Sequence, residues 1–229
     1  MAFTYAILRL RFLAVAFITV ASFLGYLGYP ASLCLSPNDV IVHGIPDEHR
    51  LREGDILSVD AGAVYEGFHG DAAFTMPIGE VSEEAQRLIE VTEEALWAGI
   101  RQVRKGNHLG DIGAVIAEVG ESNGFGVVEE YVGHGIGRQM HEEPQVPNYG
   151  HRGQGLRLRN GLALCIEPMF NVGAKHTTVD PDGWTVRTRD GSLSAHWEHT
   201  VCLTPDGPEV FTAGEQPIAV EFEQSAARS

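Results

Sequence analysis

Hydrophobic side chains recur at helical spacing in two stretches of the chain. In residues 82–106, one face carries Leu88, Ile89, Leu96 and Ile100. In residues 109–124, one face carries Leu109, Ile112, Ile116 and Val119. Acidic residues follow Ser82 and basic residues precede Gly106, which is the order of charges that a helix dipole favours. The pattern predicts two amphipathic helices, the first from Ser82 to a stop at Gly106 and the second ending at Gly124.

Four shorter apolar stretches are typical of strands. They are residues 55–64, 68–76, 162–167 and 197–203. Glu66 and Gly67 lie between the first two, and this tight turn predicts a β-hairpin. Because the two helices lie between pairs of strands along the chain, the sequence favours an α+β fold.

The two ends of the chain differ from the middle. Arg9 and Arg11 are basic, and residues 12–29 are almost continuously apolar. That pattern is typical of a signal peptide or a membrane anchor, and equally of a buried helix that leads into a strand. Residues after Gly214 are polar and predict a frayed tail. The expected organisation is an apolar segment 1–22, one folded domain 23–213 and a polar tail 214–229.

The composition fits a globular domain in a reducing compartment. The chain has 229 residues, 44% of them hydrophobic, and a formal net charge of −15. It has no lysine or arginine block after Arg11, so a phosphate backbone is a poor partner. The three cysteines, Cys34, Cys165 and Cys202, include no CxxC pair, which argues against a disulfide framework and against a structural zinc site made of thiolates.

Two segments of the chain resemble each other. LREGDILSVD (residues 51–60) and LRNGLALCIE (residues 158–167) share Leu, Arg and Gly in register, and both end on a carboxylate. A His-Gly pair precedes each copy, with His43 before the first and His134 before the second. The repeat predicts a duplicated half whose two strands converge on one site.

Acidic residues stand in the predicted strands where apolar ones would pack better. In the hairpin Asp60 pairs with Ala73, so Asp71, two residues from Ala73, lies on the same face. Diagonal neighbours in a hairpin are about 7–8 Å apart at the backbone, which lets these carboxylates converge. Glu167 and Glu198 would bring the number of acids to four. Unit charges about 4 Å apart repel by about 4 kcal/mol in partly screened protein, so protons or cations must neutralise the group.

Two divalent cations would balance four carboxylates. Sites for two metal ions need carboxylates that bridge the ions as well as carboxylates that bind one of them. His134 lies between Gly133 and Gly135, where the backbone can approach closely, and it would add an imidazole ligand. Oxygen-rich ligation with one imidazole suits manganese, iron, cobalt or zinc. The sequence therefore predicts a dinuclear metal site.

From about residue 23 to about residue 210 the chain closely resembles bacterial type I methionine aminopeptidases, which have the duplicated pita-bread fold. The segments that carry the resemblance, in the family's order, are GYPASLCLSPNDVIVHGIPD, DAGAVYEGFHGD, YVGHGIGRQMHEEP, CIEPMF and SAHWEHT. The resemblance implies a centre of two divalent ions, cobalt, manganese, iron or zinc, on a pseudo-two-fold axis. The metal ligands that it implies are Asp60, Asp71, His134, Glu167 and Glu198, with Asp71 and Glu198 in the bridging places.

The same resemblance implies removal of the N-terminal methionine from nascent proteins whose second residue is small. Glu167 would carry a proton from the attacking water to the leaving amine. His141 would hydrogen-bond the carbonyl oxygen of the substrate and His43 the amide nitrogen that leaves, so both would be catalytic and would contact substrate. The residues that match the lining of the methionine pocket are Tyr26, Tyr29, Cys34 and Trp184.

The resemblance is weakest at the front of the chain. Family members have further helices and a strand before this point, and residues 1–21 do not resemble them, so the first half is expected to be truncated or divergent. A proline-directed aminopeptidase of the same fold, or an inactive or binding variant, remains an alternative. Expected partners are peptide and nascent-chain N-termini, with the ribosome as a further candidate. A cytoplasmic monomer is expected, with membrane tethering through residues 6–24 as the alternative.

Overall fold

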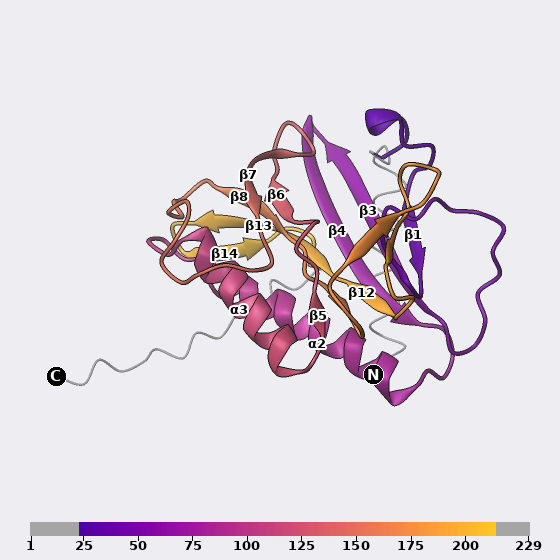
Figure 1. The fold of residues 1–229 in the computed structure, drawn as a ribbon. Coiled ribbons are helices and arrows are strands. Elements are labelled where there is room, and N and C mark those ends of the chain that lie inside the picture. The colour runs from indigo at the N-terminus through magenta and orange to yellow at the C-terminus, as the bar shows by residue number, and fades with distance from the viewer. Residues whose placement is uncertain (1–22, 214–229) are drawn as a thin grey trace.

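The computed structural model describes residues 23–213 of the chain. A large sheet of eight strands lies at the centre, two helices lie together along one side of it, and two three-stranded sheets complete the described part (Figure 1). Within this range, no helix is long and apolar enough to cross a membrane. The mixed architecture confirms the α+β prediction, whereas the expectations for residues 1–22 and 214–229 lie outside the described residues.

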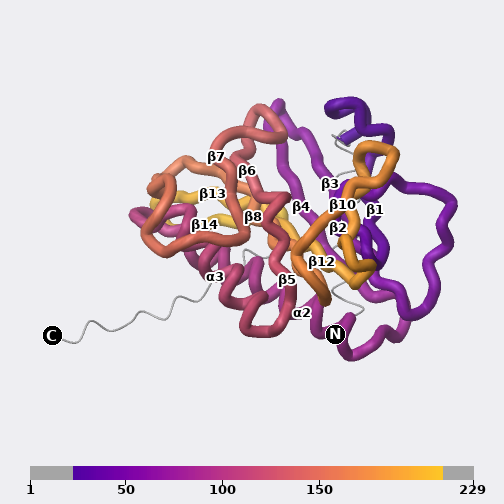
Figure 2. Tube along the Cα trace, in the orientation of Figure 1, coloured from indigo at the N-terminus to yellow at the C-terminus, as the bar shows by residue number. Residues whose placement is uncertain are grey.

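The large sheet has the strand order β1–β3–β4–β13–β8–β6–β7, and β14 pairs with β13. In that order the strands are β1 Cys34–Pro37, β3 Ile56–Tyr65, β4 Phe68–Pro77, β13 Glu198–Thr204, β8 Ala163–Ile166, β6 Gly133–Gly135, β7 Glu142–Val146 and β14 Gly207–Val210. One small sheet is β10 Thr177–Val179, β11 Val186–Thr188 and β2 Val40–Val42. The other is β12 Ser194–His196, β9 Met169–Asn171 and β5 Gly126–Val127. The chain trace shows how β2, from early in the sequence, joins strands from late in it (Figure 2).

Strands β3 and β4 form the hairpin that the sequence predicts. Glu66 and Gly67 make its turn with φ angles of 50° and 79°, a left-handed conformation that matches the twist of the two strands. The register pairs Asp60 with Ala73 and Gly62 with Asp71, as predicted. Asp60 and Asp71 therefore lie on one face of the sheet.

The two predicted helices are present, and one is shorter than expected. Helix α2 (Glu83–Ile100) begins after Ser82, whose side chain accepts a hydrogen bond from the backbone N–H of Ala85. The predicted stop at Gly106 is wrong, because the chain turns at Arg101 and places Val103 fully inside the core. Helix α3 (Leu109–Ser122) is followed by Gly124 with a φ of 81°, in agreement with the prediction.

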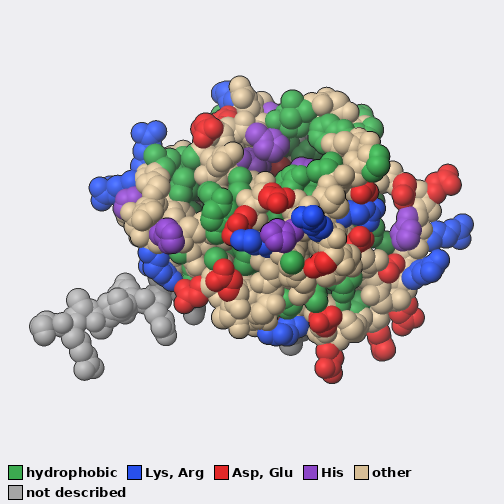
Figure 3. Space-filling view, viewed as in Figure 1, with side chains coloured by type: hydrophobic (Ala, Val, Ile, Leu, Met, Phe, Trp, Pro, Cys, Tyr) green, Lys and Arg blue, Asp and Glu red, His purple; other side chains and the backbone are tan. Residues whose placement is uncertain are grey.

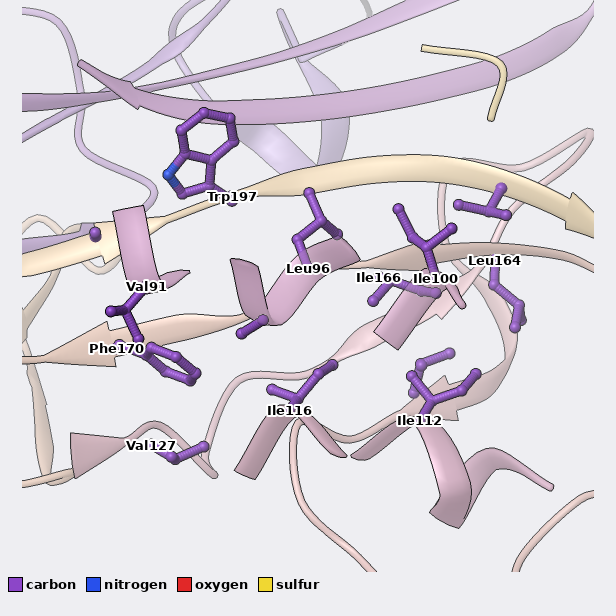
Figure 4. Close-up of a cluster of buried hydrophobic side chains, with 14 of the residues drawn as sticks. Val91, Leu96, Ile100, Ile112, Ile116, Val127, Leu164, Ile166, Phe170 and Trp197 are labelled. Carbon is purple, nitrogen blue, oxygen red and sulfur yellow. The ribbon is translucent and has the colours of Figure 1, made fainter. Parts of the chain in front are cut away.

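The main core lies between the helices and one face of the large sheet. The side chains that meet there include Leu96 and Ile100 of α2, Ile112 and Ile116 of α3, and Leu164 and Ile166 of β8 (Figure 4). All six are 0% exposed, and burial of each such side chain stabilises the fold by about 1.5–3 kcal/mol. Because strand side chains alternate, Cys165, between Leu164 and Ile166, points to the opposite face of the sheet.

The sequence did not predict the shorter strands. An early helix turn, η1 (Tyr26–Gly28), and strands such as β5 and β6 contain only two or three residues each. A stretch of that length shows no hydrophobic period. These elements are set by tertiary contacts, and several of them carry residues of the candidate site.

Candidate active site

Two carboxylates flank one alanine at the centre of the large sheet. Asp60 of β3 and Glu198 of β13 both pair in register with Ala73 of β4. Asp71 lies two residues from Ala73 on the same face, and its backbone N–H donates to Thr200 Oγ1 of β13 at 2.9 Å. Carboxylate oxygens of Asp60, Asp71 and Glu198 lie within 4.8 Å of one another. The predicted convergence of these three acids is present.

Glu198 belongs to a second group of donor atoms as well as to the group of Asp60, Asp71 and Glu198. Donor atoms of His134, Cys165 and Glu198 also lie within 4.8 Å of one another. His134 Nδ1 is 2.9 Å from the carbonyl oxygen of Gly135, and since a carbonyl only accepts, Nδ1 donates and Nε2 keeps a free lone pair. His134 Nε2 lies 3.6 Å from Glu167 Oε1. All five predicted ligands therefore border one region, and Glu198 has the central place.

The carboxylates of this region hold protons strongly when no cation is near. Burial raises the pKa of Asp71 to about 7. Burial and the charges of the neighbouring carboxylates raise the pKa values of Asp60, Glu167 and Glu198 well above the usual range. Burial and the same negative charges raise the pKa of the Cys165 thiol. The four acids repel one another, as the sequence predicts.

The unpaired oxygen atoms fit divalent metal ions. Among the described residues, the buried atoms Asp60 Oδ1 and Glu198 Oε1 have no hydrogen-bond partner. A buried polar atom without a partner costs about 1–3 kcal/mol, and more if it is charged. A divalent ion would satisfy both atoms and cancel the repulsion between the carboxylates. Clustered carboxylates with one free imidazole nitrogen are a donor set that divalent metal ions accept.

Histidines border the site on the open side. The imidazole rings of His134 and His141 lie 4.1 Å apart between centroids, and Tyr26 Oη lies 2.9 Å from His141 Nδ1. His43 follows β2 with a φ of 59° and makes edge contacts with Tyr131 and Trp184. Burial lowers the pKa of His43 and of His134 to about 4, so both are neutral at neutral pH. Figure 3 shows histidine in a hollow of the surface bordered by hydrophobic side chains.

The four predicted pocket residues belong to one apolar cluster beside the acids. Tyr29 and Trp184 pack edge to face with centroids 5.2 Å apart, and Tyr29 Oη donates to the carbonyl of Gly44 at 2.8 Å. Cys34 of β1 pairs in register with Asp60, which places the pocket next to the carboxylates. The further members of the cluster include Phe23, Ile136, Met140 and Cys165, and the sequence had not assigned Phe23 or Cys165 to the site.

The structure adds two polar residues that the sequence did not single out. His196 of β12 is 2% exposed, and its Nε2 lies 3.7 Å from Glu167 Oε2. Asn148 Nδ2 donates to the backbone carbonyl of Glu167 at 3.0 Å. Asn148 therefore holds the backbone at Glu167, and the His196 ring lies beside its carboxylate. His196 lies two residues before Glu198, but β12 ends at His196 and β13 begins at Glu198 in another sheet, so no strand period in the sequence indicated it.

The fold and its donor set define a metallopeptidase. Residues 9–205 match metallopeptidase family M24, and the chain belongs to that family. The match begins inside the segment 1–22 that the sequence analysis had set apart. Membership of a metallopeptidase family implies divalent metal ions as cofactors.

Several relatives are named methionine aminopeptidases. The one from Clostridium acetobutylicum is 53% identical over 197 residues, which are 86% of this chain and 79% of the relative. The crystal structure of the one from Thermotoga maritima is 48% identical, covers 85% of this chain and 78% of that chain, and has a TM-score of 0.83. Prolidase from Pyrococcus furiosus has 22% identity and a TM-score of 0.63, covers 80% of this chain and 49% of that one, and shows the fold alone. These matches confirm the predicted resemblance and the pita-bread fold.

Proposed function

We propose that this chain is a metal-dependent aminopeptidase that removes N-terminal methionine from peptides and nascent chains with a small second residue. The observation that carries the proposal is the pair of donor groups that share Glu198, directly beside the apolar cluster that contains Tyr29, Cys34 and Trp184. The high identity to methionine aminopeptidases over most of the chain supports the same substrate.

The residues that would hold two divalent ions are Asp60, Asp71, His134, Glu167 and Glu198. Glu198 belongs to both donor groups and Asp71 lies beside it on the adjacent strand, so these two would lie nearest to both ions. When bound, such ions acidify a water molecule and polarise the scissile carbonyl group. Manganese, iron, cobalt and zinc all suit this donor set.

The chain's own residues would then move protons and orient the substrate. Glu167 would accept a proton from the attacking water and deliver it to the nitrogen of the leaving amine. Asn148 would hold the backbone at Glu167 through its hydrogen bond to the carbonyl oxygen, and the His196 ring lies beside the carboxylate. A carboxyl group whose surroundings favour the protonated form is suited to hold a proton between two such transfers.

Two histidines would bind the reacting peptide bond. His141, hydrogen-bonded through Nδ1 to Tyr26 Oη, would direct Nε2 at the substrate carbonyl oxygen. His43 would contact the amide nitrogen that leaves, and its low pKa keeps the ring neutral, so it offers both a donor and an acceptor nitrogen.

The apolar pocket would select methionine. A thioether packs favourably against aromatic rings, which Tyr29 and Trp184 supply, and against the neighbouring sulfur of Cys34. A charged side chain would lose its hydration in this pocket without gaining a partner, so it is disfavoured. We expect the protein to act as a monomer in the cytoplasm on emerging chains, where the ribosome would be a further partner.

The test is release of methionine by the purified full chain. With Mn²⁺, Co²⁺ or Fe²⁺ present, we expect free methionine from Met-Ala-Ser, no release from Leu-Ala-Ser, and no cleavage of Xaa-Pro peptides. Glu167→Gln should bind substrate but lose at least about 100-fold in kcat, because its amide cannot accept the proton. A metal-loaded chain that releases no methionine would support a binding protein, and cleavage only of Xaa-Pro peptides would support the proline-directed alternative.

A further inference from the structure

Cys165 lies in the wall of the metal-binding region. It is 0% exposed on β8, which ends one residue before Glu167. Across the sheet it pairs in register with Thr200 of β13, and its Sγ lies 3.6 Å from Thr200 Oγ1. Thr200 is two residues from Glu198 on that strand. The thiol is therefore next to the carboxylate that both donor groups share.

The geometry groups this thiol with two metal-binding atoms. Donor atoms of His134, Cys165 and Glu198 lie within 4.8 Å of one another, as do those of Asp60, Asp71 and Glu198. Glu198 Oε1 is buried and has no hydrogen-bond partner among the described residues. His134 presents a free Nε2, since Nδ1 donates to Gly135. The second group thus offers one nitrogen, one sulfur and one oxygen around a common point.

We propose that Cys165 Sγ is a direct ligand of the metal ion held by His134 and Glu198, in addition to the five ligands that the proposed function assigns. This inference rests on that function, because it needs the dinuclear centre. Binding exchanges the S–H bond for a sulfur–metal bond and releases the proton to water. The positive charge of a coordinated ion favours this exchange.

A sulfur ligand has a consequence for which metal the centre prefers. Thiolates favour zinc and iron over manganese, whereas carboxylates and water suit manganese. The group of Asp60, Asp71 and Glu198 offers oxygen alone, so we expect the two ion positions to differ in preference. The His134 position should favour Zn²⁺ or Co²⁺, and the Asp60 position should accept Mn²⁺.

X-ray absorption of the zinc-loaded full chain tests the bond without any substitution. We expect a sulfur scatterer at about 2.3 Å from zinc, distinct from nitrogen and oxygen at about 2.0–2.2 Å. A shell of nitrogen and oxygen alone, with the His134 position filled, would overturn the proposal. In that case Cys165 is a hydrogen-bonding neighbour of Glu198 and not a ligand.

Cobalt spectra of matched variants identify the sulfur. Wild-type protein loaded with Co²⁺ should show a near-ultraviolet charge-transfer band, and Cys165→Ser should lose it. Cys34→Ser and Cys202→Ser should keep it, since neither sulfur belongs to a group of metal-binding donor atoms among the described residues. If Cys34→Ser abolishes the band and Cys165→Ser keeps it, the proposal is wrong. If Cys165→Ser does not fold, the X-ray absorption result decides.

The two proposals fail in different ways. If the zinc ligands are all oxygen and nitrogen and the chain releases methionine, the proposed sulfur ligand is wrong and the proposed aminopeptidase function stands. If a sulfur–metal bond is found and the chain releases no methionine, the proposed aminopeptidase function is wrong and the proposed sulfur ligand stands.

Discussion

Asp60 and Glu198 stand on either side of Ala73, each paired with it in register, although they come from strands far apart in the sequence. Neighbouring strands are about 4.8 Å apart, so the backbones of these two acids are separated by about 10 Å. Their carboxylate oxygens nevertheless approach within 4.8 Å, together with those of Asp71. The side chains therefore lean toward each other above Ala73, which is 2% exposed and forms the floor between them.

That arrangement predicts that Ala73 must stay small. Ala73→Val adds two methyl groups between the carboxylates and should push them apart, so affinity for Mn²⁺ should fall about 10–100-fold, as it does when groups supporting a metal site are changed. Isothermal titration of the metal-free protein measures this. The control is Ala72→Val, next on the same strand but facing the opposite side of the sheet. Equal affinities for both variants would contradict the role of Ala73.

Metal binding should stabilise the protein, and Glu198 should be essential to that effect. At a free Mn²⁺ concentration of about 100 times Kd, linkage gives about 2.7 kcal/mol, which for a domain of this size raises Tm by about 5–10 °C. Glu198→Gln should abolish the rise, because the amide cannot bridge two cations. The metal-free variant should be no less stable than the metal-free wild type, since burial favours a neutral side chain here and the amide of Gln is neutral at every pH, whereas Glu198 must take up a proton on folding. Calorimetric scans with and without Mn²⁺ measure both effects.

The matched control for Glu198→Gln is Glu118→Gln on α3. The Glu118 side chain is 66% exposed and pairs with Arg152 at the surface, away from the site. Removal of such an exposed pair changes stability by less than about 1 kcal/mol, so the full rise in Tm with Mn²⁺ should remain. A rise in Tm that survives Glu198→Gln as well would show that the ions bind elsewhere.

The sequence predicts the parts of this site that follow from local geometry. The turn at Glu66 and Gly67 fixes the register of β3 against β4, and the register fixes Asp60 and Asp71 on one face. The contact between β4 and β13 has no local cause. It depends on pairs such as Asp71 with Thr200, which are 129 residues apart in the chain, and only the family resemblance indicated it.

Cys165 and His196 are two residues of the site that could not be predicted from the sequence. Each lies two residues before a predicted ligand, but β8 ends before Glu167 and β12 ends before Glu198, so strand alternation does not by itself place either residue on the ligand face. Neither was singled out, because a buried cysteine or histidine in an apolar strand has the same pattern as an ordinary core residue. Only the distances of Cys165 to Glu198 and of His196 to Glu167 distinguish a residue of the metal-binding region from an ordinary core residue.

The hydrogen bond between Tyr26 and His141 should affect the rate of turnover. Tyr26 Oη and His141 Nδ1 are 2.9 Å apart, and their rings stack at 5.5 Å between centroids. Tyr26→Phe keeps the stacking and removes one neutral hydrogen bond, worth about 0.5–1.5 kcal/mol, so kcat should fall about 2–10-fold. His141→Ala removes the group that contacts the substrate oxygen, and kcat should fall about 100–1,000-fold. Steady-state hydrolysis of Met-Ala-Ser measures both.

The split between kcat and KM separates the possible roles of Tyr26. If Tyr26 positions His141, Tyr26→Phe should lower kcat at a nearly constant KM, and Tyr26→Phe combined with His141→Ala should be no slower than His141→Ala alone. A raised KM with an unchanged kcat would show that Tyr26 serves only as a wall of the pocket.

Acid should destabilise the metal-free protein partly through His43. This ring is held neutral by burial and by its neighbour His141, with a pKa of about 4 against 6.5 for an ordinary histidine. Between pH 6.5 and 4 the His43 ring binds a proton in the unfolded chain but not in the folded chain. The free energy of unfolding therefore falls as the pH is lowered through this range. Above pH 6.5 this group makes no difference to stability. The loss is at most about 3 kcal/mol.

His43→Gln removes this titration and leaves that of the four carboxylates in place. The free energy of unfolding of wild type minus variant should therefore decrease as the pH falls from 7 to 4, while the carboxylate contributions, which favour the folded state at low pH, cancel in the difference. Urea unfolding of the chelated proteins at several pH values measures it. A difference that is constant with pH would mean that His43 becomes protonated as readily in the folded chain as in the unfolded one, and the neutral ring assigned to substrate binding would then be wrong.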